Sequence, residues 1–160
     1  MNVNGKYLKE YENIMKSTNL QRDYQEFIKF FRYLKIYLEK EMPEYKFTGN
    51  IVENNMDYSY FQFSNETLKS KGLKIVIVFV HKTCNYEVWL SGINRKVQVQ
   101  YHKELLNSYS KYTITSDPTR LDYILKHIII SDCDYSNIDR LIHEIKSETL
   151  NFIEDVQSLV

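Results

Sequence analysis

The chain has 160 residues, 43% of them apolar and 26% charged, a composition typical of one soluble globular domain spanning 1–160. Its 21 basic and 21 acidic residues balance, and residues 112–160 hold four basic against nine acidic ones, so nucleic-acid binding is not expected. The sequence has neither an apolar run near the ~20 residues of a membrane span nor a signal peptide, which predicts a cytoplasmic protein without a membrane partner.

Two helices are predicted at the start of the chain. Apolar residues recur at helical spacing from Tyr7 to Met15 and again from Tyr24 to Leu38, and Pro43 stops the second helix. Because only the short joint "STNLQ" separates them, we expect the two helices to pack as an antiparallel hairpin.

Four strands are predicted next, joined by short connections. The third of them, "LKIVIVFVH", is apolar on both faces and should be central, with helices covering at least one side. Consecutive strands with short joints favour an antiparallel meander. The predicted strands are 45–54, 56–64, 73–81 and 85–91.

Helices dominate the rest of the prediction. Residues 95–108 alternate like a strand but also repeat every four residues, and Asn94 is a good N-cap, so a helix is preferred there. A short edge strand at 112–117 follows. Asp117 then caps a helix with apolar residues over 121–129, and Ser136 caps a last helix with apolar residues over 138–156. The expected class is therefore α+β: an N-terminal helical hairpin, a four-stranded mainly antiparallel meander, and C-terminal helices packed on one face of the sheet.

The usual catalytic and metal-binding signatures are missing from the sequence. Neither a glycine-rich phosphate loop nor a nucleophile or zinc-protease motif is present. Cys84 and Cys133 lie about fifty residues apart and lack the partner ligands that zinc requires. In a cytoplasmic protein both are expected to stay reduced. No cofactor and no metal are expected.

One face of the predicted sheet combines aromatic and polar side chains. On the second and fourth strands, alternation places Tyr58, Tyr60 and Gln62 on the same face as Glu87 and Trp89. Aromatic rings with polar tips around a carboxylate can form a ligand cradle or a partner surface. Equally, cross-strand aromatic pairs can simply stabilise the sheet.

The strand that carries Trp89 ends at Gly92, where a helix is expected to begin. Arg95 and Lys96 open that helix, although cations are unfavourable at a helix N-terminus unless something negative is close. That group is either Glu87, in a structural ion pair, or an anionic ligand. This junction of strand and helix is the best place in the sequence for a pocket.

A metal-dependent hydrolase is the alternative. Asp57 and Glu87 are carboxylates on neighbouring predicted strands, an arrangement that nuclease-like sites also use. The acid-x-lysine pairing of such sites is absent here, because Val88 and Trp89 follow Glu87.

The segments "MDYSYFQFS", "LKIVIVFVH" and "YEVWLSGINRKVQ" resemble a family of small bacterial proteins of unknown function. The resemblance extends from the second helix to the C-terminus. It implies a single bacterial domain and assigns no role to any residue.

We therefore expect a non-enzymatic module that binds an unknown small molecule or protein segment. The expected binding residues are Tyr58, Tyr60, Glu87, Trp89 and Arg95. A hydrolase that uses Asp57 and Glu87, and a homodimer formed through a flat sheet face, stay open as alternatives.

Overall fold

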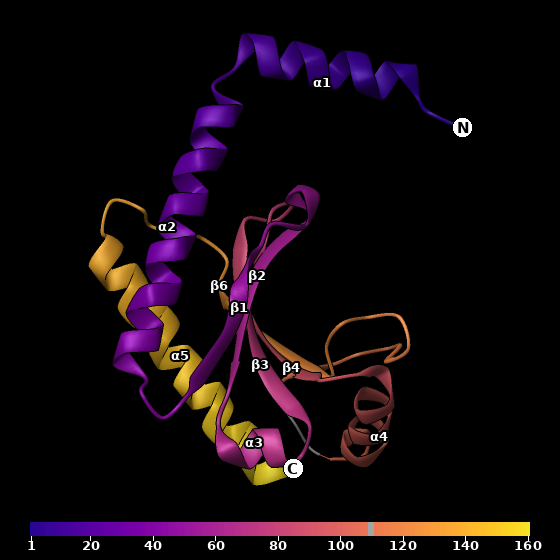
Figure 1. Cartoon of the computed structure of the whole chain (residues 1–160), viewed down its shortest axis with the longest axis vertical. Coiled ribbons are helices and arrows are strands. Elements are labelled where there is room, and N and C mark those ends of the chain that lie inside the picture. Colours follow the sequence, from indigo (N-terminus) through magenta and orange to yellow (C-terminus); the bar gives the residue numbers. More distant parts are fainter. Residues whose placement is uncertain (109–110) are drawn as a thin grey trace. The chain divides into compact units, whose positions relative to one another are not determined.

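A computed structural model describes residues 1–108 and 111–160 of the chain. Its helices and strands follow one another as labelled in Figure 1. The chain divides into two units, Met1–Tyr37 and Leu38–Val160, and the boundary falls inside the second helix. The single domain expected over 1–160 therefore stays a prediction.

The first unit holds the first predicted helix and most of the second. Helix α1 (Gly5–Ser17) begins at Asn4, whose side chain accepts a hydrogen bond from the backbone N–H of Lys6, and helix α2 spans Leu20–Glu41. Along α2, the rings of Phe27 and Phe31 stack at 5.6 Å. Helix α1 buries none of its residues, which contradicts an antiparallel hairpin in which its apolar stripe would pack on α2.

Within the described residues of the second unit, six antiparallel strands form one sheet in the order β1-β2-β3-β4-β6-β5. The first four strands follow the predicted meander, with β3 in its interior. The predicted sheet of four is wrong, because two later strands extend it beyond β4: β5 lies within the edge strand predicted at 112–117, whereas β6 was predicted as a helix. The strands are β1 (Lys46–Val52), β2 (Tyr58–Ser64), β3 (Leu73–Val80), β4 (Asn85–Gly92), β5 (Thr113–Ile114) and β6 (Leu125–Ile130).

Strand β6 replaces the helix predicted over 121–129. The apolar residues of this segment do recur at helical spacing. Nevertheless, the backbone N–H of Ile124 donates to the carbonyl of Leu90 at 2.7 Å, and the residues that follow pair with β4. Without β6, the edge of β4 would carry unpaired backbone groups beside buried side chains, which is costly. Sheet pairing therefore overrides periodicity here. Asp117, the expected helix cap, closes only a turn, in which its carbonyl accepts from the N–H of Leu121 at 3.0 Å.

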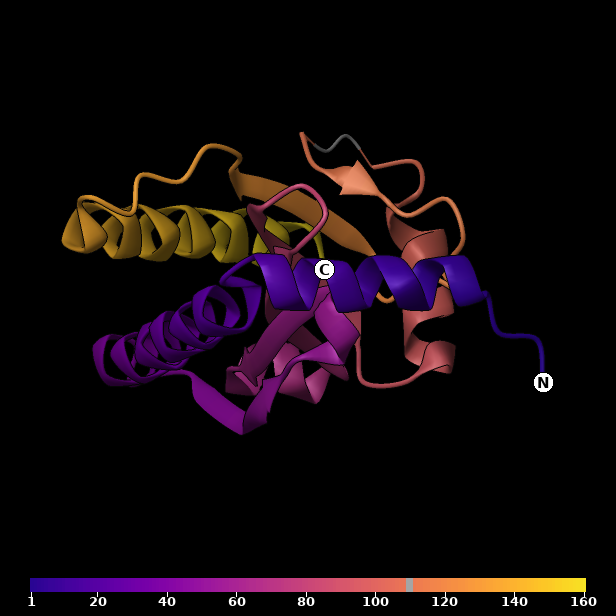
Figure 2. The same ribbon diagram turned by 90° about the horizontal axis from the view of Figure 1, so that it is seen from above.

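Helix α5 (Ile138–Leu159) covers one face of the sheet and contacts β4 and β6 (Figures 1 and 2). Its predicted apolar stripe is largely confirmed, because Leu141, Ile142, Ile145, Phe152, Ile153 and Val156 are buried. Asn137 caps the helix by accepting from the N–H of Arg140 at 3.1 Å. The predicted capping residue was Ser136, one position earlier.

Shorter helical elements complete the described part of the chain. Helix α4 (Arg95–Leu105) confirms the preferred reading of that segment, and its predicted N-cap Asn94 accepts from the N–H of Val97 at 2.9 Å. A 3-10 turn, Asn54–Met56, and helix α3 (Glu66–Ser70) precede it and were not predicted. No helix in the described residues has both the length and the apolar character that a membrane span needs.

The face of the sheet opposite α5 carries a second, smaller apolar cluster. Val76, Val78 and Trp89 are buried there, with half-buried tyrosines packed around them. This is the mixed face that strand alternation predicted. It also carries the candidate site.

Candidate functional site

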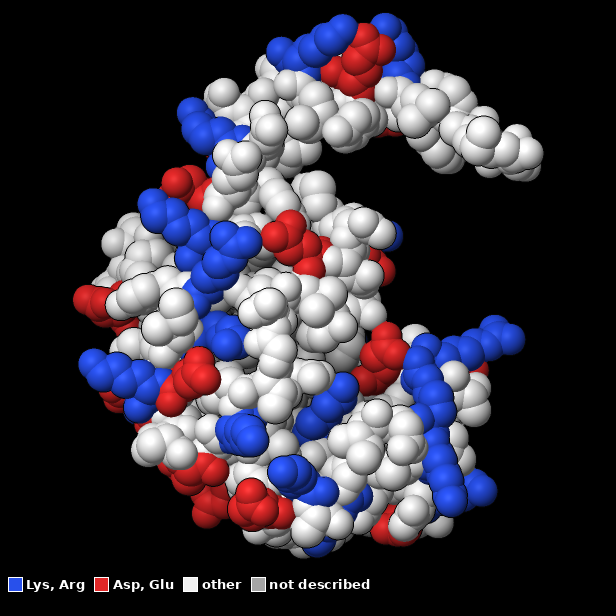
Figure 3. Space-filling model, viewed as in Figure 1, with Lys and Arg blue, Asp and Glu red and all other residues white. Residues whose placement is uncertain are grey.

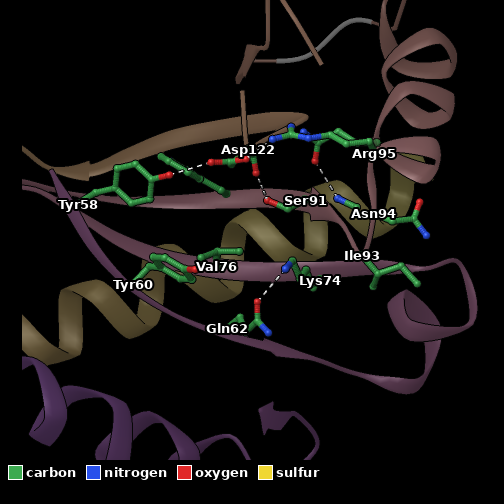
Figure 4. Close-up of a pocket in the computed structure, with 13 residues that line it drawn as sticks. Tyr58, Tyr60, Gln62, Lys74, Val76, Ser91, Ile93, Asn94, Arg95 and Asp122 are labelled. Carbon is green, nitrogen blue, oxygen red and sulfur yellow. Dashed lines mark hydrogen bonds and ion pairs between the residues drawn. The ribbon is translucent and has the colours of Figure 1, made fainter. Parts of the chain in front are cut away.

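A pocket of about 290 Å³ opens on this second face (Figure 4). Strands β2, β3 and β4 form its floor, while the start of α4 and the loop before β6 form its rim. Its lining combines aromatic, amide and charged side chains. These residues are Tyr58, Tyr60, Gln62, Lys74, Val76, Trp89, Ser91, Gly92, Ile93, Asn94, Arg95, Gln98 and Asp122.

Strand register explains why these side chains meet. Val76 of β3 lies between Gln62 of β2 and Trp89 of β4, and Lys74 lies opposite Ser91. Because alternate residues of a strand point to the same face, the side chains at these positions share one surface. The floor of the pocket thus follows from local strand geometry and from the hairpins that pair the strands.

Aromatic rings form one wall of the pocket. The ring centroid of Trp89 lies 5.4 Å from that of Tyr58 and 5.3 Å from that of Tyr123, and the Tyr58 ring lies 5.9 Å from Tyr60. The rings are tilted against one another, an arrangement that aromatic quadrupoles favour over a face-to-face sandwich. Only 8% of Trp89 is exposed, so its indole is part of the wall and not a free side chain.

Glu87 lies next to Trp89 on the same face of β4 and does not line the pocket. Its carboxylate accepts from the indole N–H of Trp89 at 2.7 Å and from the side-chain amide of Asn85 at 3.2 Å. The ammonium of Lys126 lies 3.6 Å away and balances its charge. Glu87 is 4% exposed, and these partners account for how a carboxylate is buried there.

Asp122 connects the loop before β6 to the other residues of the pocket. Its carboxylate accepts from the guanidinium of Arg95 at 2.5 Å and from the hydroxyl of Tyr58 at 2.8 Å (Figure 4). Its backbone carbonyl accepts from the hydroxyl of Ser91 at 2.6 Å. Arg95 therefore pairs with Asp122, and the expected ion pair with Glu87 is wrong.

Gln98 provides a second link between the start of α4 and the same loop. Its side-chain oxygen accepts from the N–H of Gly92 at 3.1 Å, and its amide nitrogen donates to the carbonyl of Leu121 at 2.5 Å. A Cβ on Gly92 would lie 2.6 Å from the backbone nitrogen of Gln98, so only glycine allows this approach. Gly92 thus sets the angle at which strand turns into helix.

Lys74 is the cation on the pocket floor. Its ammonium donates to the side-chain oxygen of Gln62 at 2.8 Å, and burial lowers the pKa of Lys74, partly opposed by the charge of Asp122. Among the described residues, no carboxylate oxygen lies within ion-pairing distance of this ammonium.

Comparison with known proteins identifies the family. A family of domains of unknown function, DUF7000, matches residues 4–160. The chain belongs to this family. It matches no curated protein and no solved structure.

In this DUF7000 domain, four of the five expected binding residues lie around one pocket: Tyr58, Tyr60, Trp89 and Arg95. The fifth, Glu87, lies outside the pocket lining and accepts a hydrogen bond from Trp89. Two charged residues were missed. Lys74 could have been found from the sequence, because it is the lone charged residue within an otherwise apolar stretch. Asp122 could not, because its segment was predicted as a helix and not as part of the sheet.

The carboxylates of the alternative hydrolase are not brought together in this DUF7000 domain. Asp57 is exposed just before β2, and alternation directs Glu87 to the face of Tyr58, not of Ser59. Within residues 1–108 and 111–160, no group of three or more His, Cys, Asp or Glu residues is placed to hold a metal ion. The hydrolase reading stays an untested prediction without support from this geometry.

The two cysteines of this DUF7000 domain are free thiols that lie side by side. The sulfur of Cys133 is 3.8 Å from the backbone carbonyl oxygen of Cys84, although the two residues are 49 positions apart in the sequence. Cys84 is exposed at the turn between β3 and β4. Pairing of β6 with β4 brings Cys133 to it.

Proposed function

We propose that this chain is a non-enzymatic module that binds a small molecule in the pocket on the face of its sheet opposite α5. The observation that carries the proposal is the convergence of aromatic, amide and charged groups from five elements on one space of about 290 Å³. A pocket with an aromatic wall and a few placed polar groups is the usual form of a small-molecule site.

The network around the pocket supports a binding role, because it holds the site in shape. Asp122, Gln98 and Ser91 connect the rim loop to both strand and helix through short hydrogen bonds. Pre-organised side chains lose little freedom when a ligand arrives, so more of the contact energy appears as affinity.

The volume favours a small molecule over a protein segment. At about 30 Å³ for each water of the liquid, the pocket holds on the order of ten waters. That space suits one ring with one or two substituents. A protein segment that uses the same aromatic wall, or a second copy of the chain, is an alternative outcome of the test below.

The test uses the single tryptophan as its reporter. Purified protein is screened with metabolites by thermal shift, because a ligand that binds only the native state raises the melting temperature. Each hit is then titrated while the one indole N–H signal of Trp89 is followed by NMR. A hit at this pocket should move both readouts.

A matched pair of variants localises the binding. Tyr60→Ala removes part of the pocket wall, whereas Tyr33→Ala removes a 51% exposed tyrosine of the first unit. The first should abolish the ligand's thermal shift and the second should leave it intact. Binding that survives Tyr60→Ala and never moves the indole signal would place the site elsewhere.

A further inference from the structure

We infer that the ligand is a small planar ring carrying one anionic group, with the anion against Lys74 and the ring against the aromatic wall. This inference rests on the proposed function and specifies the chemistry of its ligand. The anionic group is a carboxylate or a phosphate, since both offer the oxygens that an ammonium binds.

The charge balance of the pocket is the first argument. Its lining holds two cations, Lys74 and Arg95, and one carboxylate, Asp122, which leaves a balance of +1. Arg95 is neutralised by Asp122 at 2.5 Å and also donates to the carbonyl of Leu121. The unbalanced charge is therefore that of Lys74.

The surroundings of Lys74 are the second argument. Its ammonium is half-buried on the floor and meets one amide oxygen, that of Gln62. An ammonium has three N–H donors, and taking it out of water without a counter-charge in direct contact is unfavourable. Burial accordingly lowers the pKa of Lys74. An anion in the pocket would supply the missing charge.

The start of α4 is the third argument. This helix of 11 residues begins at the rim, with Asn94 and Arg95 in the pocket lining. The dipole of a helix and its first free N–H groups favour a nearby anion. Lys96 and Lys103 are further basic residues of α4. Figure 3 shows Lys and Arg side chains gathered at the lower right, where this helix lies.

The aromatic wall and the floor specify the rest of the ligand. Tyr60 and Trp89 present ring surface, and Val76, which lies opposite Trp89 in the register of the strands, adds an apolar patch. Flat apolar surface of this kind favours a planar ring through stacking or edge contacts. The single surplus cation matches a single anionic group.

The experiment compares four ligands of similar size on the intact chain. Phenylacetate and phenyl phosphate carry the anion, phenylacetamide is the neutral analogue, and phenethylamine is the cationic one. Binding is measured by calorimetry, and the Trp89 indole signal reports the location. Either anion, or both, should bind at least about tenfold tighter than the neutral and cationic compounds, because a charge-assisted hydrogen bond outweighs a neutral one. The preferred anion identifies the group.

Two lysine variants with the same change of net charge provide the control. Lys74→Met keeps the length of the side chain and removes its charge inside the pocket, whereas Lys69→Met does so on exposed α3. Lys74→Met should weaken anion binding by about tenfold or more. Lys69→Met should leave it unchanged. Thermal unfolding of both variants verifies that each is folded.

The outcomes separate the two proposals. If the neutral or cationic compound moves the indole signal as strongly as the anions, the pocket binds ligands but the anionic class is wrong. Equal weakening by both lysine variants would also overturn the class, because the effect would then be long-range charge. If no compound here and no hit of the metabolite screen binds at the pocket, the proposed function itself fails.

Discussion

The carboxylate of Glu87 and the indole N–H of Trp89 lie 2.7 Å apart, two positions along one strand and on one face of it. This hydrogen bond helps to fix the orientation of the largest ring of the pocket wall. It also explains why Glu87 is buried and yet absent from the lining, since its carboxylate is occupied by Trp89, Asn85 and Lys126. Glu87 thus positions Trp89, and the residues that line the pocket are left to contact a ligand.

We predict that Glu87→Ala destabilises the protein by about 3 kcal/mol or more, because it leaves Lys126 and two N–H groups without their partner. Glu87→Gln should cost less, since one side-chain oxygen still accepts from the indole. Chemical denaturation measures both. Glu154→Ala, on the exposed side of α5, is the control. Equal costs at positions 87 and 154 would contradict the role assigned to Glu87.

We predict that Thr149→Val stabilises the protein by about 1 kcal/mol. Thr149 is fully buried on α5, and its hydroxyl has no hydrogen-bond partner among the described residues. Replacing an unsatisfied hydroxyl by a methyl of the same shape removes a desolvation cost. Thr67→Val, at an exposed position of α3, should change stability little. A less stable Thr149→Val protein would show that the hydroxyl is satisfied in solution.

We predict that His81 makes the protein less stable as the pH falls. Burial lowers the pKa of His81 in the folded state, an effect that the charge of Asp57 partly opposes. Its contribution is therefore present above the unfolded value near 6.5 and is lost as the pH falls through the lower folded pKa. Denaturation of wild type and His81→Gln between about pH 8 and about pH 5 measures this. The advantage of wild type over the variant should shrink toward acid pH, and a constant difference would refute it.

We predict that Cys84 and Cys133 form an intramolecular disulfide with oxidised glutathione. One thiolate attacks the glutathione disulfide and releases a glutathione thiol, and the second cysteine then displaces the remaining glutathione. The contact between Cys133 and the backbone of Cys84 makes the second step local. Peptide mapping without reductant should find the crosslink. Cys84→Ser should keep only a glutathione adduct at Cys133, and adducts without crosslink in wild type would contradict the prediction.

The pocket floor could be predicted from the sequence because strand alternation depends on local backbone geometry. Alternation along β2 and β4, with the more apolar side of β4 assigned to the helices, was enough to place Tyr58, Tyr60 and Trp89 on one face. The hydrogen bond between Glu87 and Trp89 could not be predicted, because it depends on which way the indole lies. That choice is made by neighbours such as Tyr58 and Tyr123, which come from other elements.

The rim loop shows the limit of periodicity as a signal. Leu121, Ile124, Leu125 and Ile128 repeat as in a helix, yet Ile128 is 48% exposed and the segment pairs as a strand. The deciding factor is an open edge on β4, which belongs to a distant part of the chain. The ion pair between Asp122 and Arg95 depends on that pairing, because Asp122 lies in the loop that leads into β6. Sequence reasoning therefore reached the face of the site and missed the groups that close it.

The strand order also has a kinetic consequence. Strands β1 to β4 pair with their immediate neighbours in sequence, so they can form through a succession of local hairpins. Strand β6 adds to β4 only after residues 93–124 have been looped back, a non-local step of the kind that slows folding. Asp122 reaches Tyr58 and Arg95 only in that step. We therefore expect the pocket to be among the last features to assemble, because its floor needs only β2 to β4 whereas its rim depends on the pairing of β6 with β4.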